Sequence, residues 1–172
     1  MNARTICEYL DQIRWGYMPV DDATVLTGYP CIVPFYDFRV PIEIKITGHW
    51  VTIRALLQQA ITVDRLASIA AFLSTMNAQC RVVRYFVIND CAVLQAEVPL
   101  SRFHPGTFLE ALKNVCRYAS TTGLEVSVLA TNRSVLDLYK DATAHLARNV
   151  GGGIADDDPA LQFDISANRL AD

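Results

Sequence analysis

The segment VPIEIKITGHWVTIRAL, residues 40–56, decides the fold, because apolar and polar residues alternate on both sides of one Gly-His pair. If Gly48 takes the first central position of a two-residue type II′ turn, Ile44 lies opposite Ile53 and Glu43 lies opposite Arg54. The first pair belongs to an apolar face and the second is an opposite-charge pair on the other face. The same register pairs Ile46 with Val51, Ile42 with Ala55, Lys45 with Thr52 and Thr47 with Trp50. The segment therefore predicts a β-hairpin with one buried face.

A second hairpin is predicted around Asn89-Asp90, residues that tolerate the positive φ of a type I′ turn. Its strands are 82–88 and 91–98. The core face pairs Val87 with Ala92, Tyr85 with Leu94 and Val83 with Ala96, and the opposite face holds Val82, Arg84, Phe86, Ile88, Val93, Gln95 and Glu97. Half of that opposite face is apolar, so we expect something to cover part of it.

Helical spacing of apolar residues marks several further segments. The predicted helices are 4–15 with a capping box at Thr5 and Glu8, 64–77 capped by Asp64 and ending at Asn77, a third capped by Thr107 and ending before Gly123, and 134–149. The predicted strands outside the hairpins are 24–29, 31–38 and 124–130.

The order of these segments predicts an α+β protein, with an antiparallel β-sheet and helices packed on it. Residues 1–150 are expected to form a single domain, because the chain of 172 residues is of ordinary single-domain length. The Gly151–Gly153 run and the Asp156–Asp158 run change the composition, so residues 151–172 are expected to form a flexible acidic tail.

Charge and composition exclude several classes of protein. The formal net charge is −3, and Lys and Arg are scattered, so we expect no nucleic-acid partner. No apolar run reaches the about 20 residues of a membrane span, so we expect no membrane partner. The residues from Met1 to Thr5 lack the features of a secretory signal, and the expected localisation is cytoplasmic.

The cysteines and histidines form no metal-binding or redox motif. The cysteines are Cys7, Cys31, Cys80, Cys91 and Cys116, and no Cys-x-x-Cys pair occurs. We expect buried thiols in a reducing compartment, with an exposed, redox-responsive Cys91 as the alternative. The histidines, His49, His104 and His145, are far apart and are expected to be turn or surface residues. No metal and no cofactor is therefore expected.

Catalytic motifs are missing as well. The chain has no Gly-x-Ser-x-Gly elbow around a serine, and the glycine run is followed by acidic residues that would repel phosphate. Glu43 and Glu97 are candidates for an acid and base pair, but each has a cationic neighbour, Arg54 and Arg84, which favours surface pairing. We expect a protein that is not an enzyme.

The features that stand out are two large aromatic residues on the non-core faces of the hairpins. Trp50 and Phe86 occupy these faces, with Arg54 and Arg84 nearby. Aromatic residues and arginine are enriched where proteins bind one another, so these four residues are the predicted binding site. The alternative is that another part of the same subunit covers both rings.

The chain resembles the YbjN-like family, whose fold is that of the type III secretion chaperones. The resemblance rests on the helix 64–78, the hairpin 82–98, and the Val98-Pro99-Leu100 segment leading into 108–118, and it covers residues 4–123. It implies a small cytosolic dimer: the secretion chaperones bind extended client segments, and the YbjN-like branch is associated with regulation rather than catalysis. The residues after Gly123 depart from this pattern, which bears on the dimer geometry.

These observations predict a non-enzymatic binding module, chaperone-like or regulatory, that forms a homodimer and engages a protein or peptide client through a sheet face. The alternative is a small-molecule sensor or enzyme with a pocket between sheet and helix, using Glu97, Tyr85 or His104.

Overall fold

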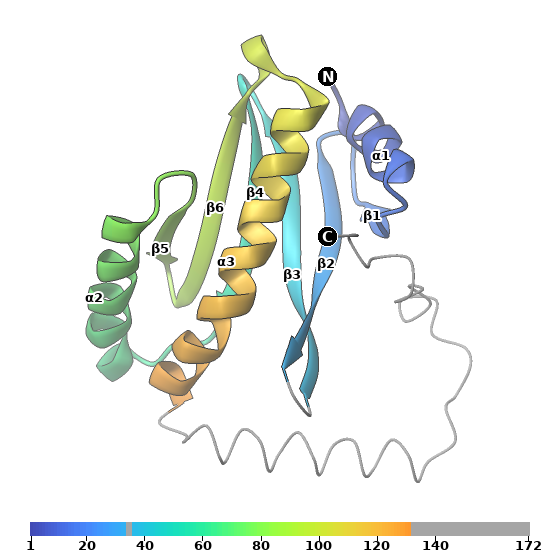
Figure 1. The fold of residues 1–172 in the computed structure, drawn as a ribbon. Coiled ribbons are helices and arrows are strands. Elements are labelled where there is room, and N and C mark those ends of the chain that lie inside the picture. The colour runs from blue at the N-terminus through green and yellow to red at the C-terminus, as the bar shows by residue number, and fades with distance from the viewer. Residues whose placement is uncertain (34–35, 132–172) are drawn as a thin grey trace, which may run out of the picture.

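The computed structural model describes residues 1–33 and 36–131, and the side chains of residues 31–38 are not described. The chain forms a two-layer α+β fold, with three α-helices packed on an antiparallel six-stranded open sheet of order β1-β2-β3-β4-β6-β5 (Figure 1). The elements are α1 (Ala3–Gln12), β1 (Tyr17–Pro19), β2 (Thr24–Val33), β3 (Tyr36–Thr47), β4 (Trp50–Gln58), α2 (Val63–Gln79), β5 (Arg84–Ile88), β6 (Cys91–Pro99), the 3-10 turn η1 (Leu100–Arg102) and α3 (Pro105–Thr131). The predicted fold class and element order are confirmed.

The hairpin of β3 and β4 has the predicted register at every predicted pair, from Ile42↔Ala55 to Thr47↔Trp50. Gly48 has φ of 47°, whereas His49 does not have positive φ, which is the pattern of a type II′ turn. The alternation of apolar and polar residues therefore fixed the faces of this hairpin correctly.

The second hairpin also has the predicted register, with Tyr85↔Leu94 and Val87↔Ala92. Two details differ. The strand begins at Arg84 rather than at Val82. Of the two turn residues only Asn89 has positive φ, at 56°, so the turn does not have the two positive φ values of type I′.

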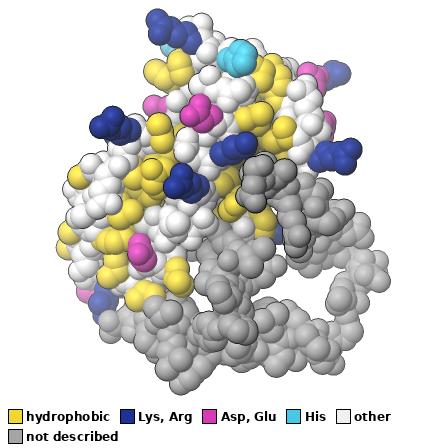
Figure 2. Space-filling view, viewed as in Figure 1, with side chains coloured by type: hydrophobic (Ala, Val, Ile, Leu, Met, Phe, Trp, Pro, Cys, Tyr) yellow, Lys and Arg dark blue, Asp and Glu magenta, His cyan; other side chains and the backbone are white. Residues whose placement is uncertain are grey.

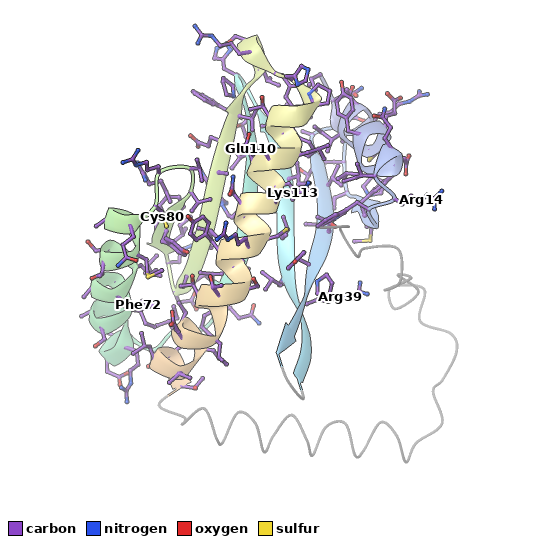
Figure 3. All side chains as sticks on the ribbon, in the orientation of Figure 1. Arg14, Arg39, Phe72, Cys80, Glu110 and Lys113 are labelled. Atoms are coloured by element: carbon purple, nitrogen blue, oxygen red, sulfur yellow. The ribbon has the colours of Figure 1, made fainter. Side chains whose placement is uncertain are left out.

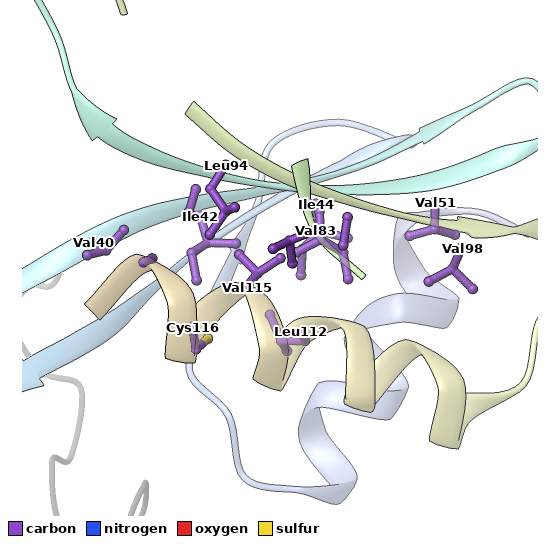
Figure 4. Close-up of a cluster of buried hydrophobic side chains, with 14 of the residues drawn as sticks. Val40, Ile42, Ile44, Val51, Val83, Leu94, Val98, Leu112, Val115 and Cys116 are labelled. Atoms are coloured by element: carbon purple, nitrogen blue, oxygen red, sulfur yellow. The ribbon is translucent and has the colours of Figure 1, made fainter. Parts of the chain in front are cut away.

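The core lies between the sheet and the helices, and its largest fully buried side chains come from both layers. These side chains are Phe108, Ile6, Leu10, Ile42, Ile44, Ile53, Ile69, Leu73, Leu94, Leu112, Val25 and Val40. Figure 4 shows the central part of this cluster, where Leu112, Val115 and Cys116 of α3 face the side chains of the sheet. Burying Val, Leu, Ile and Phe side chains stabilises the fold by about 1.5–3 kcal/mol for each residue.

The three helices differ from the prediction at their ends. In α1, the side chain of Asn2 accepts a hydrogen bond from the Thr5 backbone N–H, so Asn2 is the cap rather than Thr5. Helix α2 begins before Asp64, after Thr62. Helix α3 begins with Pro105 in the first position, where a proline loses no helical hydrogen bond.

The N-terminal end of α3 is capped by a histidine. His104 Nδ1 accepts a hydrogen bond from the Gly106 N–H, at 3.1 Å, so the cap predicted at Thr107 is wrong. This interaction also assigns His104 a structural position in the loop before the helix.

The largest correction concerns residues 124–130, which are helical and not a strand. Gly123 was expected to end α3, but the buried stripe continues through Thr122, Gly123 and Val126 at helical spacing. Gly123 has no positive φ, and therefore its backbone is ordinary helix. The predicted helix 134–149 and the predicted tail 151–172 lie outside the described residues.

Residues 28–33 and 36–41 form a two-stranded ribbon that extends beyond the rest of the sheet (Figure 1). The β3–β4 ladder ends at Ile42↔Ala55, and the next residue of β3 is Pro41. By the alternation of an antiparallel ladder, the nitrogen of Pro41 faces β4 and cannot donate to it. The proline therefore marks the point at which the ribbon separates from β4.

Strand β5 lies at one margin of the sheet, and an amide side chain closes part of its free edge. Asn77 of α2 donates from Nδ2 to the Tyr85 carbonyl oxygen, at 2.7 Å, and its Oδ1 accepts from the Tyr85 N–H, at 2.8 Å. The side chain thus takes the place that a neighbouring strand would occupy at this residue.

Candidate functional site

The candidate site lies on the sheet face opposite the helices, which we call the outer face. Its central row runs across the strands in register, with one residue from each strand. The row consists of Met18, Leu26, Glu43, Arg54, Gln95 and Arg84. No described helix packs on this face, so these side chains are presented together.

Arg54 is held in place by its neighbours in this row. Its Nε and one terminal nitrogen donate to Gln95 Oε1, at 3.0 and 2.8 Å, and its other terminal nitrogen lies 3.8 Å from Glu43 Oε1. Gln95 Nε2 in turn donates to Glu97 Oε1, at 2.8 Å. The predicted pairing of Glu43 with Arg54 is confirmed, whereas Glu97 pairs with Gln95 and makes no ion pair with Arg84 in the described structure.

A shallow hollow of about 320 Å³, which we call the β5 hollow, lies on the outer face between the start of β4 and the start of β5, across β6. It is lined by Trp50, Arg81, Val82, Arg84, Phe86, Gln95, Ala96 and Glu97. Of the predicted binding residues, Trp50, Arg84 and Phe86 therefore meet in one place, and Arg54 does not line it. Arg81 was not predicted as a site residue, because it precedes the strand and its position depends on how the chain leaves α2.

The two aromatic rings of the predicted site are accessible in the described structure. Trp50 is 43% exposed and Phe86 is half-buried. The apolar side chain of Val82, at the rim, is 55% exposed. Neither hairpin is shifted by a residue, so the rings lie on the face that the register predicted.

Backbone carbonyl groups hold the guanidinium of Arg84. One terminal nitrogen donates to the Cys80 carbonyl oxygen, at 2.8 Å, and is 3.3 Å from the Val83 carbonyl oxygen. Arg81 is exposed and makes no hydrogen bond or ion pair within residues 1–33 and 36–131. Within the part of the chain that the structure describes, the β5 hollow thus combines one anchored and one free cation.

A second hollow of about 420 Å³ lies beside the first on the outer face and is mainly apolar. Its lining residues are Leu26, Thr27, Pro41, Ile42, Glu43, Arg54, Leu56 and Val93. Leu26 is 37% exposed, whereas Val93 is already buried at 5%. Arg54 therefore lies between two hollows of the same face.

The helix side of the molecule has its own hollow, of about 360 Å³, beside α3. Its lining residues are Trp15, Tyr29, Glu110, Lys113, Asn114, Cys116 and Arg117. Figure 3 labels Glu110 and Lys113 on α3. The Trp15 ring stacks on Tyr29, and its Nε1 donates to Thr27 Oγ1 at 2.7 Å. These contacts account for the burial of Trp15 by packing. Figure 2 shows basic and acidic side chains interspersed on this side, without a block of one sign.

The residues proposed for a small-molecule or enzymatic pocket do not come together. Tyr85 is buried under α3, with its hydroxyl 2.8 Å from Thr122 Oγ1, whereas Glu97 is exposed on the outer face. His104 lies in the loop before α3. Burial raises the pKa of Tyr85 to about 12, so its phenol is neutral over the physiological range.

None of the cysteines in the described part of the chain forms a disulfide. Cys7, Cys80 and Cys116 are buried, as predicted for core thiols, and Cys91 is intermediate. Burial raises the pKa of Cys91, and so does the neighbouring Asp90, whose carboxylate accepts a hydrogen bond from the thiol. A raised pKa lowers the thiolate fraction, so this site does not have the electropositive surroundings of a reactive cysteine.

Two other kinds of feature are absent from the described residues. No group of three or more His, Cys, Asp or Glu side chains is placed to hold a metal ion. No helix in this part of the chain is long and apolar enough to cross a membrane.

Comparison with known proteins supports the fold. No protein-family model matches the chain, and no curated protein matches it in sequence. Among solved structures, the chain is similar to YbjN, a proposed transcription regulator from E. coli, with a TM-score of 0.57 and 15% identity. The match covers 73% of this chain and 90% of YbjN. The YbjN-like fold expected from the sequence is confirmed.

Proposed function

We propose that this YbjN-like chain is a non-enzymatic binding module, regulatory or chaperone-like, that engages a protein or peptide partner through its outer face. The observation that carries the proposal is the meeting of Trp50, Arg84 and Phe86 around one hollow on a sheet face on which no described helix packs. Tryptophan, tyrosine and arginine dominate the binding energy of protein interfaces, and such residues cluster around hollows that exclude water. Arg54, fixed between the two hollows, extends this surface toward the apolar side.

The likeness to YbjN favours a regulatory role over catalysis. Nucleic-acid binding depends on cations that neutralise phosphates, and this chain has a formal net charge of −3. We therefore infer that regulation by this protein runs through contacts with another protein.

Self-association is part of the proposal. A homodimer that buries an apolar sheet or helix surface would be isologous, with the same patch on both subunits. Light scattering on the purified chain measures the mass in solution, and a monomer at all concentrations contradicts this part.

The binding role is tested by the double substitution Trp50→Ala and Phe86→Ala, made in the full chain. Proteins that co-purify from the native cell are identified with the unchanged chain, and their affinity for both forms is then measured with purified components. We expect the double substitution to weaken binding by tenfold or more, because interface aromatic residues contribute about 2 kcal/mol or more each when they are anchors.

The matched control is Val63→Ala, since Val63 is the most exposed of the large hydrophobic residues in the described structure, at 85%. The control should bind as the unchanged chain does. Equal binding by the double variant, or unfolding of the double variant at room temperature, contradicts the proposal, because the rings would then be irrelevant to binding or part of the core.

A further inference from the structure

We propose that the β5 hollow recognises an acidic peptide segment that carries a large apolar side chain next to its carboxylates. The inference rests on the proposed function and names the chemistry of the partner for the same face. It depends on the charges of the hollow, on its apolar walls and on its size.

The charge of the hollow is opposite in sign to that of the chain. Its lining includes Arg81 and Arg84 but a single carboxylate, Glu97, whereas the whole chain has a formal net charge of −3. Glu97 already accepts a hydrogen bond from Gln95. The charged groups of the hollow that can bind a ligand are therefore Arg81 and Arg84, and they favour an anionic ligand.

The two arginines differ in how they would contribute. Arg84 is pre-oriented, since it donates to the carbonyl oxygens of Cys80 and Val83, so little further ordering is needed when a carboxylate binds. Arg81 makes no hydrogen bond or ion pair within the part of the chain that the structure describes, and its five N–H donors are open to an incoming carboxylate. Arginine binds carboxylates in a bidentate manner, which adds orientation to attraction.

The apolar walls of the hollow favour a ligand that carries an apolar group beside its negative charge. Trp50 is 43% exposed and Val82 is 55% exposed, and the half-buried Phe86 ring completes the wall. A small inorganic anion would leave this apolar surface in water, whereas an aromatic or aliphatic side chain would cover it. The volume of about 320 Å³ lies at the lower end of ligand pockets, which suits one large side chain and its neighbours.

The test uses the purified full chain and three fluorescently labelled synthetic peptides. The probe is acetyl-Gly-Asp-Glu-Leu-Phe-Asp-Gly-amide, the second peptide replaces its acidic residues by Asn and Gln, and the third replaces Leu and Phe by Ser. We expect the probe to bind, and both altered peptides to bind at least fivefold more weakly. The affinity for the probe should fall as salt is added, because salt screens the exposed charges of the arginines.

The matched pair of variants is Arg81→Glu and Lys113→Glu. Both reverse one exposed charge, but Lys113 lies on α3 at the helix side of the sheet. We expect Arg81→Glu to weaken binding of the probe about fivefold or more and Lys113→Glu to leave it unchanged. If the two variants weaken binding equally, the probe responds to the net charge of the chain and not to the β5 hollow, and the inference is overturned.

The remaining outcomes also decide the matter. The inference fails if no probe binds, if the uncharged peptide binds as tightly as the acidic one, or if inorganic phosphate at equal concentration displaces the probe. These results leave the proposed function standing, provided that Trp50→Ala with Phe86→Ala still weakens binding of a natural partner. If that double substitution has no effect on the partner, the proposed function itself fails.

Discussion

Asn77→Ala should destabilise the fold although Asn77 is neither a core nor a predicted site residue. The substitution removes two hydrogen bonds to the Tyr85 backbone, at 2.7 and 2.8 Å. Each contributes about 1 kcal/mol net, and alanine regains about 0.5 kcal/mol through its higher helix propensity. The expected loss in the free energy of unfolding is therefore about 1.5 kcal/mol.

The assay is urea unfolding followed by circular dichroism, with Ser74→Ala as the control. Ser74 lies on the same helix and is exposed, and its side chain makes no hydrogen bond within the described residues. Its substitution should therefore change the free energy of unfolding by less than about 0.5 kcal/mol. Asn77→Asp should be more damaging at neutral pH than at low pH, because a carboxylate cannot donate to the Tyr85 carbonyl oxygen whereas a carboxylic acid can. If Asn77→Ala and Ser74→Ala have equal effects, the amide does not seal the edge of β5.

The other predictions concern stability. Gly123→Ala should raise the free energy of unfolding by about 0.5–1 kcal/mol, since the backbone is helical and a Cβ added there meets no atom within 4 Å. A lowered melting temperature would contradict this prediction. Ile44→Ala should cost about 2–5 kcal/mol in urea unfolding because Ile44 is fully buried, whereas Trp50→Ala should stay within about 0.5 kcal/mol; similar losses would mean that the outer face is covered. The pKa of Tyr85 is raised to about 12 from 10, so the stability that its neutral form contributes is complete below pH 10 and is lost as the pH rises toward 12. Ultraviolet titration of the phenols should show that Tyr85→Phe lacks one of the late-titrating groups of the unchanged chain and keeps that of Tyr17, whose pKa is also raised to about 12.

The pairing registers of the two hairpins could be predicted to the residue, although the start of β5 and the turn type at Asn89-Asp90 were predicted wrongly. In the first hairpin, two constraints agreed. Alternation of apolar residues defined the faces, and Gly48 defined the turn, so a shift by one residue would have reversed Ile44 and Glu43. The outer-face positions of Trp50 and Phe86 followed from the same registers.

The end of α3 could not be predicted because a short apolar run fits a strand and a buried helix equally well. The residues 124–130 are apolar enough for either, and Gly123 suggested a stop. The packing of Val126 against the core favours a helix over a strand here, and this contact cannot be seen in the local sequence.

One residue of the binding hollow was likewise beyond local patterns. Arg81 lines the hollow because the chain bends back from α2 before β5 begins, whereas Val82 was already expected on this face. Asn77 was predicted to end the helix, but its amide makes two hydrogen bonds to the backbone of Tyr85 in β5, which lies later in the chain. Contacts of this kind join segments whose relation no local periodicity encodes.

The two edges of the sheet offer few free backbone N–H groups, which limits how copies of this protein can assemble. At one margin Asn77 satisfies Tyr85, and at the other Pro19 ends β1 and Pro30 interrupts the exposed side of β2 with a residue that has no N–H. A further strand from another molecule would find few donors in sequence on either side. Growth into an open-ended fibril is therefore disfavoured, and any complex is expected to be of finite size and to form through the broad surfaces of the sheet or helices.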